Sequence, residues 1–292
     1  MINKIELGSA QWGSAYGVSN TIGKTNYREI SDILSIAYSN GIRIIDTAPI
    51  YGDLKNSISE QNLKKFELIT KTPKFCKSII NQQDITELKS SFCNSLNTFK
   101  KSQFYGALVH HAPDLLAEGG KYIADALNDF KEKGKLKKIG VSIYDSKNLD
   151  IICDRLRPDI IQLPINVIDQ RFIKDGTIQY LKKKGIEIHA RSIFLQGLLL
   201  MTHLSMPAYF NQWKNILSTW QKACHDQNFN FLQAALNFVF NIKEIDYYLI
   251  GFENSTQLSE CISNLNFKKK FDANDLNCFD VDLINPTNWK LY

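Results

Sequence analysis

Four residues that can move a proton or hold an oxygen atom stand where short apolar runs of the chain end: Asp46, Tyr51, Lys71 and His110. The segments that carry them span residues 43–52, 67–72 and 105–110. Each run is β-prone and stops at a polar, titratable side chain. In a barrel of parallel strands the carboxyl ends of all strands meet at one rim, so these residues would become neighbours.

Together the four side chains predict a proton donor beside an oxygen-binding site. A phenol has an unperturbed pKa of about 10, so a catalytic Tyr51 needs a positive charge beside it, which Lys71 can supply. A carboxylate at Asp46 would hold that ammonium in place and keep it charged. His110 could orient a substrate oxygen. A carbonyl needs this combination while it receives hydride from a cofactor.

The elements that must position these residues alternate along the chain. Strand-like runs occur near residues 4–8, 42–47, 67–72, 105–110, 138–142, 159–164, 186–192 and 246–251. Helix-like stretches lie between them, at 27–39, 84–99, 120–133, 146–156, 173–184 and 229–240. Eight such units predict an α/β fold, a (β/α)8 TIM barrel.

The length of 292 residues and a hydrophobic content of 44% suit a single barrel domain over residues 1–292. Residues 203–228 form a longer, aromatic-rich stretch that we expect to be an insertion over the active rim. Residues 266–292 form a C-terminal tail that we expect to reach the same site. No interdomain linker or low-complexity tract interrupts the chain.

Composition limits the classes of partner that we expect. The net charge of +5 arises from 35 basic and 30 acidic residues without a basic stripe, so nucleic acid is not an expected partner. No run approaches the about 20 apolar residues of a membrane span. The six cysteines are dispersed, which favours reduced thiols. We expect a cytoplasmic monomer or small homo-oligomer with no metal, since no histidine or cysteine spacing suits one.

Several short motifs carry a family resemblance. They are Asp46-Thr-Ala with Tyr51-Gly, Thr70-Lys71, Leu108-Val-His110, Gly140-Val-Ser142, Gln162-Leu-Pro-Ile-Asn166 and Ile250-Gly-Phe. As a set they are highly specific, and from about residue 7 to 265 the chain resembles the aldo-keto reductases. The resemblance implies a barrel that binds NAD(H) or NADP(H) in extended form at the carboxyl rim, without a glycine fingerprint. No such fingerprint is present in the sequence.

The resemblance also implies a role for each residue. Tyr51 would be the general acid, Lys71 and Asp46 would tune it, and His110 would orient the carbonyl oxygen. Ser142 and Gln162 would hold the nicotinamide carboxamide. The remaining cofactor contacts would come from Arg191, Leu195, Gln196, Gly197, Gly251, Glu253 and Gln257.

Two positions near the nicotinamide depart from the family pattern. Ile143 follows Ser142 where many members carry Asn, so one carboxamide contact is missing. Arg191 aligns with the aromatic residue that usually stacks on the nicotinamide. A guanidinium repels the cationic oxidised ring more than the neutral reduced ring. The sequence therefore predicts tighter binding of the reduced cofactor.

The stretch after the eighth strand departs as well. Family members often place Lys or Arg there for the 2′-phosphate of NADP, whereas residues 251–257 hold no basic residue and one acid, Glu253. Glu253 can accept hydrogen bonds from an unphosphorylated ribose and repel a phosphate. This favours NAD(H) or dual use.

The substrate is expected to be a small carbonyl or alcohol. Trp12 and Tyr16 follow the first strand and are candidates for the substrate pocket or for packing, and His111 is a further candidate. The opening stretches, residues 7–13 and 16–20, look like a bacterial subgroup associated with sugar and surface-polysaccharide metabolism. An aldose or nucleotide-linked sugar is the corresponding expectation.

Two alternatives keep the same barrel. In one, Lys71 forms a Schiff base, as in aldolases, with Tyr51 and Asp46 as acid and base. In the other, the protein is a catalytically weak cofactor-sensing subunit, which Ile143 and Arg191 would suit. The complete set of four favours the oxidoreductase.

Overall fold

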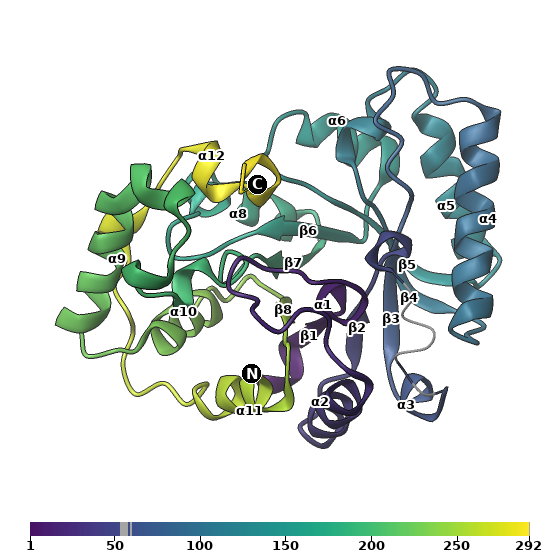
Figure 1. Cartoon of the computed structure of the whole chain (residues 1–292). Helices are drawn as coiled ribbons and strands as arrows, with labels where there is room; N and C mark the ends of the chain where they lie inside the picture. Colours follow the sequence, from purple (N-terminus) through teal and green to yellow (C-terminus); the bar gives the residue numbers. More distant parts are fainter. Residues whose placement is uncertain (53–57, 59, 292) are drawn as a thin grey trace.

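Eight parallel strands close into a barrel in chain order, β1 to β8, in a computed structural model that describes residues 1–52, 58 and 60–291 (Figure 1). The strands are β1 (Ile5–Gly8), β2 (Ile44–Asp46), β3 (Glu67–Lys71), β4 (Phe104–Val109), β5 (Leu136–Ser142), β6 (Ile160–Pro164), β7 (Glu187–Arg191) and β8 (Tyr247–Gly251). This confirms the predicted (β/α)8 fold, and β1 pairs with β8 to complete it.

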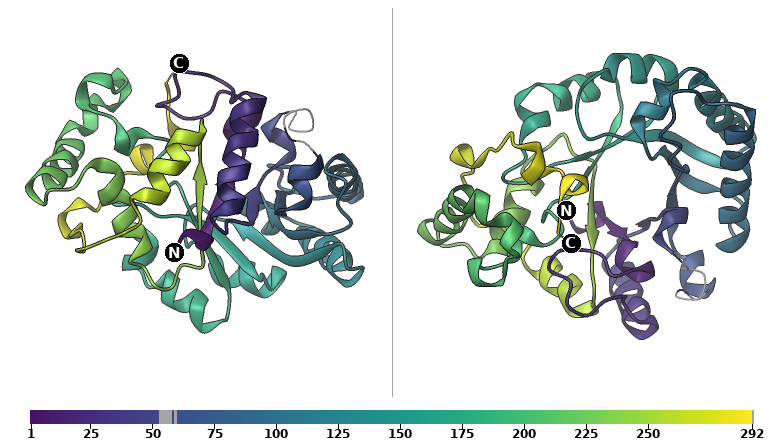
Figure 2. Two further views of the ribbon diagram at one scale, coloured as in Figure 1. Left: turned by 90° about the horizontal axis from the view of Figure 1, so that it is seen from below. Right: turned by 45° about the horizontal axis from the view of Figure 1, so that its top comes forward.

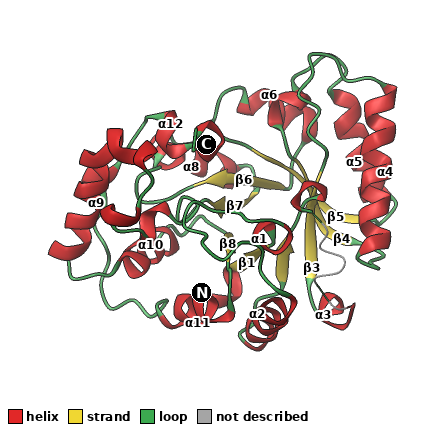
Figure 3. Cartoon of the chain, viewed as in Figure 1, coloured by secondary structure: helices red, strands yellow, loops and turns green. Residues whose placement is uncertain are grey.

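Helices surround the barrel on its outside, as the red and yellow elements of Figure 3 show. They are α1 (Ala10–Gly13), α2 (Tyr27–Ser39), α3 (Glu60–Lys64), α4 (Gln82–Thr98), α5 (Lys121–Glu132), α6 (Leu149–Leu156), α7 (Arg171–Lys174), α8 (Thr177–Lys183), α9 (Lys214–Asp226), α10 (Phe231–Phe240), α11 (Ser255–Ser263) and α12 (Val281–Ile284). The single helix predicted over 173–184 is two helices, because Gly176 between them adopts a φ of 79°.

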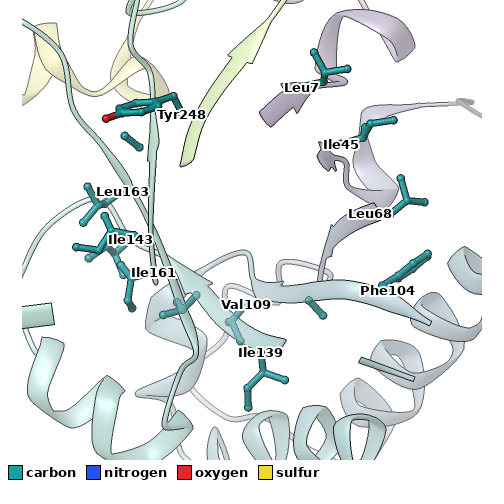
Figure 4. Packing of buried hydrophobic residues seen from close by; sticks show 14 of the residues in the cluster. Leu7, Ile45, Leu68, Phe104, Val109, Ile139, Ile143, Ile161, Leu163 and Tyr248 are labelled. Carbon is teal, nitrogen blue, oxygen red and sulfur yellow. The ribbon is translucent and has the colours of Figure 1, made fainter. Parts of the chain in front are cut away.

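The main hydrophobic core lies between the strands and the helices. Leu7, Ile45 and Leu68 come from β1, β2 and β3, and Figure 4 shows their side chains on the outer side of the strands. Val109 and Ile161 continue this layer around the barrel. Because side chains alternate along a strand, the residues between these positions face the barrel interior. The interior therefore receives Asp46 and Lys71 from β2 and β3.

The expected insertion and tail pack on each other rather than over the rim. A second hydrophobic cluster joins Phe210, Trp213 and Trp220 with Phe271 and the tail residues Leu283 and Ile284. Figures 1 and 2 show α9 beside the yellow tail, at one side of the barrel. No described residue of 203–228 or 266–291 lines the active-site cavity, and residue 292 lies outside the described chain. The aromatic side chains of residues 203–228 and of the tail bury one another.

The insertion still acts on the rim through the loop that follows β7. Trp220 Nε1 donates to the Leu199 carbonyl oxygen at 3.0 Å, and Gln221 Nε2 donates to that of Met201 at 3.1 Å. These bonds tie α9 to a loop whose residues do line the cavity. Among the described residues, no helix is long and apolar enough to cross a membrane.

Candidate active site

The four candidate catalytic residues meet at the carboxyl rim. Asp46 ends β2, Lys71 ends β3, and His110 follows the last residue of β4. Tyr51 ends a short 3-10 turn, Pro49–Tyr51, after β2. Lys71 Nζ donates a short hydrogen bond to Asp46 Oδ1 and lies 3.4 Å from Tyr51 Oη. The phenol, ammonium and carboxylate thus form one connected chain.

Burial sets the electrostatics of this chain. Asp46 is 1% exposed and Lys71 is 4% exposed. Burial alone would lower the pKa of Lys71, but the charge of Asp46, followed by that of Tyr51, outweighs it and raises the pKa. Burial also raises the pKa of Tyr51, against the opposing charge of Lys71. A lysine cation beside a protonated phenol is the state that a general acid requires.

His110 stands beside the phenol as a neutral imidazole. Its ring lies edge-on to that of Tyr51, with ring centroids 6.5 Å apart. Burial, with the positive charge of Lys71 next, lowers the pKa of His110 to about 3. Its backbone N–H donates to Thr72 Oγ1 at 3.2 Å, which fixes the end of β4. A neutral imidazole can donate one hydrogen bond to a substrate oxygen without competing for the proton.

Glycine at position 13 lets the backbone of α1 touch that of Tyr51. A Cβ on Gly13 would lie 1.4 Å from the Tyr51 carbonyl oxygen, and one on Gly52 would lie 2.7 Å from the Gly13 carbonyl oxygen. Neither glycine carried a sequence signal for a catalytic role. The contact anchors the turn that presents the phenol.

A cavity of about 390 Å³ opens beside these residues. The predicted residues that line it are Asp46, Tyr51, Lys71, His110, Ser142, Gln162, Arg191, Gln196, Gly197, Gly251, Glu253, Gln257 and Tyr16. They come from the carboxyl ends of all eight strands and the loops that follow. The cavity runs from the phenol to the first turns of α11, which suits a ligand in extended form.

Three predicted residues do not line the cavity. Trp12 is fully buried in the main core, where its Nε1 donates to the Phe252 carbonyl oxygen at 3.4 Å. His111 points to Asp114, with 2.8 Å between its Nδ1 and Asp114 Oδ1. The side chain of Leu195 is fully buried in the second cluster. Packing explains Trp12 and Leu195, and successive residues of an extended chain face opposite sides, which turns His111 away from His110.

Other lining residues were not singled out from the sequence. They include Gln11, Tyr144, Phe194, Leu200, Leu232 and Glu260. Tyr144 could have been found from the sequence, because it directly follows Ile143, where the chain departs from the family pattern. The others lie on loops and helix ends whose direction only the folded chain defines.

Arg191 packs flat on Tyr144 at the cavity wall. Its guanidinium carbon lies 4.0 Å from the centre of the Tyr144 ring. Nη2 donates to the Ile143 carbonyl oxygen at 3.0 Å, and Nη1 donates to Ser192 Oγ at 3.2 Å. Ile143 itself is buried in the core, so it contributes only its backbone to the site. No carboxylate pairs with Arg191 in the described chain, which leaves its charge directed at the cavity.

The loop that follows α1 crosses the rim and meets the loop after β7. Val18 N–H donates to the Gln196 carbonyl oxygen at 3.0 Å, and Gln196 Nε2 donates to Tyr16 Oη at 3.3 Å. Ser19 lies where a side chain on Gly197 would stand, since a Cβ there would be 1.8 Å from Ser19 Oγ. The purple loop in Figure 1 follows this course. These contacts bring Tyr16 to the cavity.

The residues present fit a nicotinamide cofactor by the chemistry of their donor set. Gln162 Nε2 donates to Asp46 Oδ2 at 3.0 Å, which leaves its carbonyl oxygen to accept from an amide. The Ser142 hydroxyl lies on the neighbouring strand, in register with Gln162. An amide oxygen and a hydroxyl side by side match the donor and acceptor of a carboxamide.

Comparisons with known proteins agree with this geometry. The model of the aldo/keto reductase family matches residues 4–280. The fold is similar to that of the aldo-keto reductase AKR11C1 from Bacillus halodurans in its holo form. That structure has a TM-score of 0.71 and 15% identity, over 94% of this chain and 89% of that one. It is also similar to the glycerol dehydrogenase AKR11B4 from Gluconobacter oxydans, with a TM-score of 0.68 and 19% identity, over 91% and 88% of the two chains.

None of the curated proteins compared with the sequence matches it significantly. The family match spans nearly the whole chain and includes both the barrel strands and the four residues at the rim. The chain therefore belongs to the aldo/keto reductase family, and it is an NAD(P)-dependent carbonyl oxidoreductase.

Proposed function

We propose that Tyr51 is the general acid in this oxidoreductase and that Lys71, Asp46 and His110 prepare it. The observation that carries the proposal is the connected chain of Asp46, Lys71 and Tyr51 at the cavity wall, with Lys71 Nζ 3.4 Å from Tyr51 Oη. Reduction leaves an alkoxide on the carbonyl oxygen as the carbon gains hydride. The Tyr51 proton neutralises that oxygen, and the Lys71 ammonium stabilises the phenolate that remains.

His110 orients the substrate oxygen in this proposal. The neutral imidazole cannot deliver its proton as readily as an imidazolium, so it donates a hydrogen bond and leaves proton transfer to Tyr51. Asp46 does not touch the substrate. It holds the lysine ammonium and, through Oδ2, the Gln162 amide. A single carboxylate thus aligns the proton donor with the carboxamide-binding residue.

When bound, the cofactor supplies the hydride, with its carboxamide against Ser142 and Gln162. Gln196, Gly197 and Gly251 would lie along the remainder of the cofactor, as cavity-lining residues. Arg191 would face the nicotinamide ring and favour the reduced form, because its charge has no carboxylate partner among the described residues. Comparable affinities for oxidised and reduced cofactor in a fluorescence titration would contradict this role of Arg191.

The adenosine end of the cavity supports a preference for NAD(H). Among the described residues that line the cavity, the two cations, Lys71 and Arg191, lie at the catalytic end, whereas α11 and the residues before it contribute Glu253 and Glu260. Burial raises the pKa of Glu253, and a second negative charge nearby would disfavour its carboxylate further. A 2′-phosphate would meet these acids without a counter-charge.

We propose a polyhydroxylated carbonyl, an aldose or a nucleotide-linked sugar, as substrate class. The cavity wall also carries the Tyr16 hydroxyl, which accepts from the Gln196 amide, and such polar groups suit a substrate rich in hydroxyls. Turnover of only small aromatic aldehydes in a panel of sugars, aldehydes and ketones would contradict this class.

The lysine aldolase is disfavoured by the same geometry. A Schiff base begins with attack by a neutral amine, whereas Asp46 holds Lys71 as an ammonium with a raised pKa. Borohydride trapping of a carbonyl on Lys71 without a nicotinamide requirement would restore that alternative.

The experiment compares wild type with Tyr51→Phe. Both proteins are titrated with NADH and NADPH by fluorescence and then assayed on the carbonyl panel. We expect both to bind cofactor and only wild type to turn over, since the variant loses one hydroxyl and no cofactor contact. Cofactor binding without turnover in wild type would favour the cofactor-sensing subunit, and equal turnover in the variant would remove Tyr51 from the mechanism.

A further inference from the structure

A column of charged side chains runs through the barrel interior from the catalytic rim toward the amino-terminal end of the strands. Glu6 on β1 and His189 on β7 are both fully buried in it. Most of a barrel interior is filled by branched apolar side chains. In the part of this chain that the structure describes, Ile44, Ile69, Leu108 and Ile160 form such a cluster. The proposed mechanism uses neither Glu6 nor His189.

His189 bridges two carboxylates. Its Nδ1 lies 2.6 Å from Glu6 Oε2 and its Nε2 lies 2.7 Å from Glu187 Oε1. Because both ring nitrogens face carboxyl oxygens, the imidazolium form can donate to both of them at once. Burial opposes that charge, but the Glu6 charge and the Glu187 hydrogen bond raise the pKa of His189 to about 9.

Glu187 anchors the far end of the column. It accepts hydrogen bonds from Tyr105 Oη at 2.8 Å and from Lys138 Nζ. Burial alone would raise the pKa of Glu187, but the hydrogen bonds from His189 and Lys138 lower it to about 2. Glu187 therefore accepts hydrogen bonds from three side chains, and its bond to His189 Nε2 orients Nδ1 of that ring toward Glu6.

Glu6 is placed to act on the catalytic lysine. It lies two residues before Gly8, whose register partner on β2 is Asp46, so alternation puts it on the interior face of β1. Its Oε1 is buried without a hydrogen-bond partner among the described residues. The charge of Glu6 helps to raise the pKa of Lys71. Burial raises the pKa of Glu6 itself, and the charge and hydrogen bond of His189 oppose that shift.

We propose that Glu6 is a positioning residue for Lys71: held ionised by His189, it supplies a second negative charge that keeps the ammonium fixed beside Tyr51. The proposal rests on the proposed function. The titratable and charged groups that face this interior are Glu6 on β1, Asp46 on β2, Lys71 on β3, Tyr105 on β4, Lys138 on β5, Glu187, His189 and Arg191 on β7 and Tyr247 on β8.

The test replaces the charge while keeping the shape, with Glu6→Gln. Without the Glu6 charge the Lys71 ammonium is held less firmly beside Tyr51, so the phenolate is harder to form and the alkaline midpoint of kcat/KM for carbonyl reduction moves up by about one pH unit. Cofactor affinity stays at the wild-type value, since Glu6 does not line the cavity. Glu6→Asp keeps the carboxylate and restores most of the midpoint.

Lys138→Met is the matched control. It removes a charge from the same network at the end remote from Lys71, so it lowers the melting temperature without moving the midpoint. The double variant E6Q/H189Q guards against loss of folding in the single variant, because it leaves no unpaired buried charge. It moves the midpoint in the same direction by a smaller amount.

A second readout does not need turnover. Tyrosine labelled with 13C at Cζ reports the ionisation of Tyr51, assigned with Tyr51→Phe, and its titration moves up in E6Q. If wild type has no activity, the proposed function fails, while this titration still decides the role of Glu6. An unmoved Tyr51 titration in E6Q, or equal loss of activity in E6Q and E6D with unchanged midpoints, would show that Glu6 only packs the barrel.

Discussion

At the scale of single residues, the proposed mechanism assigns the holding of charge and the transfer of a proton to different side chains. Asp46 and Lys71 are buried as an ion pair, and only Tyr51 and His110 of the four are partly exposed to the cavity. A buried pair of this kind is sensitive to the loss of either partner, because the remaining charge is left without compensation. Activity and folding should therefore both respond to changes at Lys71.

Lys71→Met removes the cation that stabilises the Tyr51 phenolate. We expect kcat to fall by about 10²- to 10⁴-fold, the usual contribution of general acid catalysis. Cofactor affinity, measured by fluorescence, should change by less than about threefold. Lys77→Met, which removes a half-exposed partner of Asp84 away from the cavity, is the control. A variant with wild-type kcat would separate Lys71 from the chemistry.

At the scale of elements, the loops after β1 and β7 shape the cavity rim and hold the turn that carries Tyr51. The close approach of α1 to the Tyr51 backbone and the bond between Val18 and Gln196 both cross between segments that are distant in sequence. Each contact leaves little space for an added atom. The rim is thus held by backbone packing more than by side-chain bonds.

Gly13→Ala tests the approach of α1. The added methyl group meets the Tyr51 carbonyl oxygen at 1.4 Å, so the turn must move. A displacement of this size in a catalytic group costs up to about 10²-fold in rate, and we expect kcat to fall at least tenfold on this scale while cofactor still binds. Ser14→Ala, at the exposed end of the same helix, should retain activity in the same assay. Unchanged kcat in both variants would contradict the positioning role of the contact.

The first turns of α11 provide a second test at this scale. Glu253→Lys replaces an acid at the adenosine end of the cavity by a cation. We expect the ratio of kcat/KM for NADPH over that for NADH to rise about tenfold or more, because the lysine can pair with a 2′-phosphate. Glu132→Lys, on an exposed face of α5, should leave the ratio unchanged. A wild-type ratio strongly in favour of NADPH would already contradict the proposed preference.

At the scale of the whole molecule, two histidines make the free energy of unfolding depend on pH in opposite directions. The pKa of His189 is raised to about 9, so the folded state holds a proton that the unfolded state releases above about pH 6.5. The pKa of His110 is lowered to about 3, so the unfolded state takes up a proton that the folded state does not. The two terms have opposite slopes against pH.

The free energy of unfolding should therefore fall on both sides of about pH 6.5 through these two groups. The His189 contribution is complete below that pH and is lost as pH rises toward about 9. The His110 contribution is complete above it and is lost as pH falls toward about 3. Urea unfolding of wild type, H189Q and H110Q across pH 5–9 checks this. H189Q should flatten the alkaline side alone, and a parallel loss at every pH would contradict the assignment.

Much of the fold followed from local pattern. The eight strands appear within a few residues of their predicted ranges because each is a short apolar, β-branched run between turn residues. The packing of residues 203–228 did not follow from local pattern. Their aromatic side chains bury against Phe271 and the tail, a contact whose sequence distance hides it from any window of the chain.

The sequence by itself determined the order of strands and helices, the four rim residues and the family, because these depend on short-range periodicity and on residues that end strands. Only the tertiary structure decided that Trp12 is core, that Arg191 lies on Tyr144, and that Glu6 meets His189, 183 positions away. These contacts depend on closure of the barrel and the stagger of its strands, which bring side chains together across the interior.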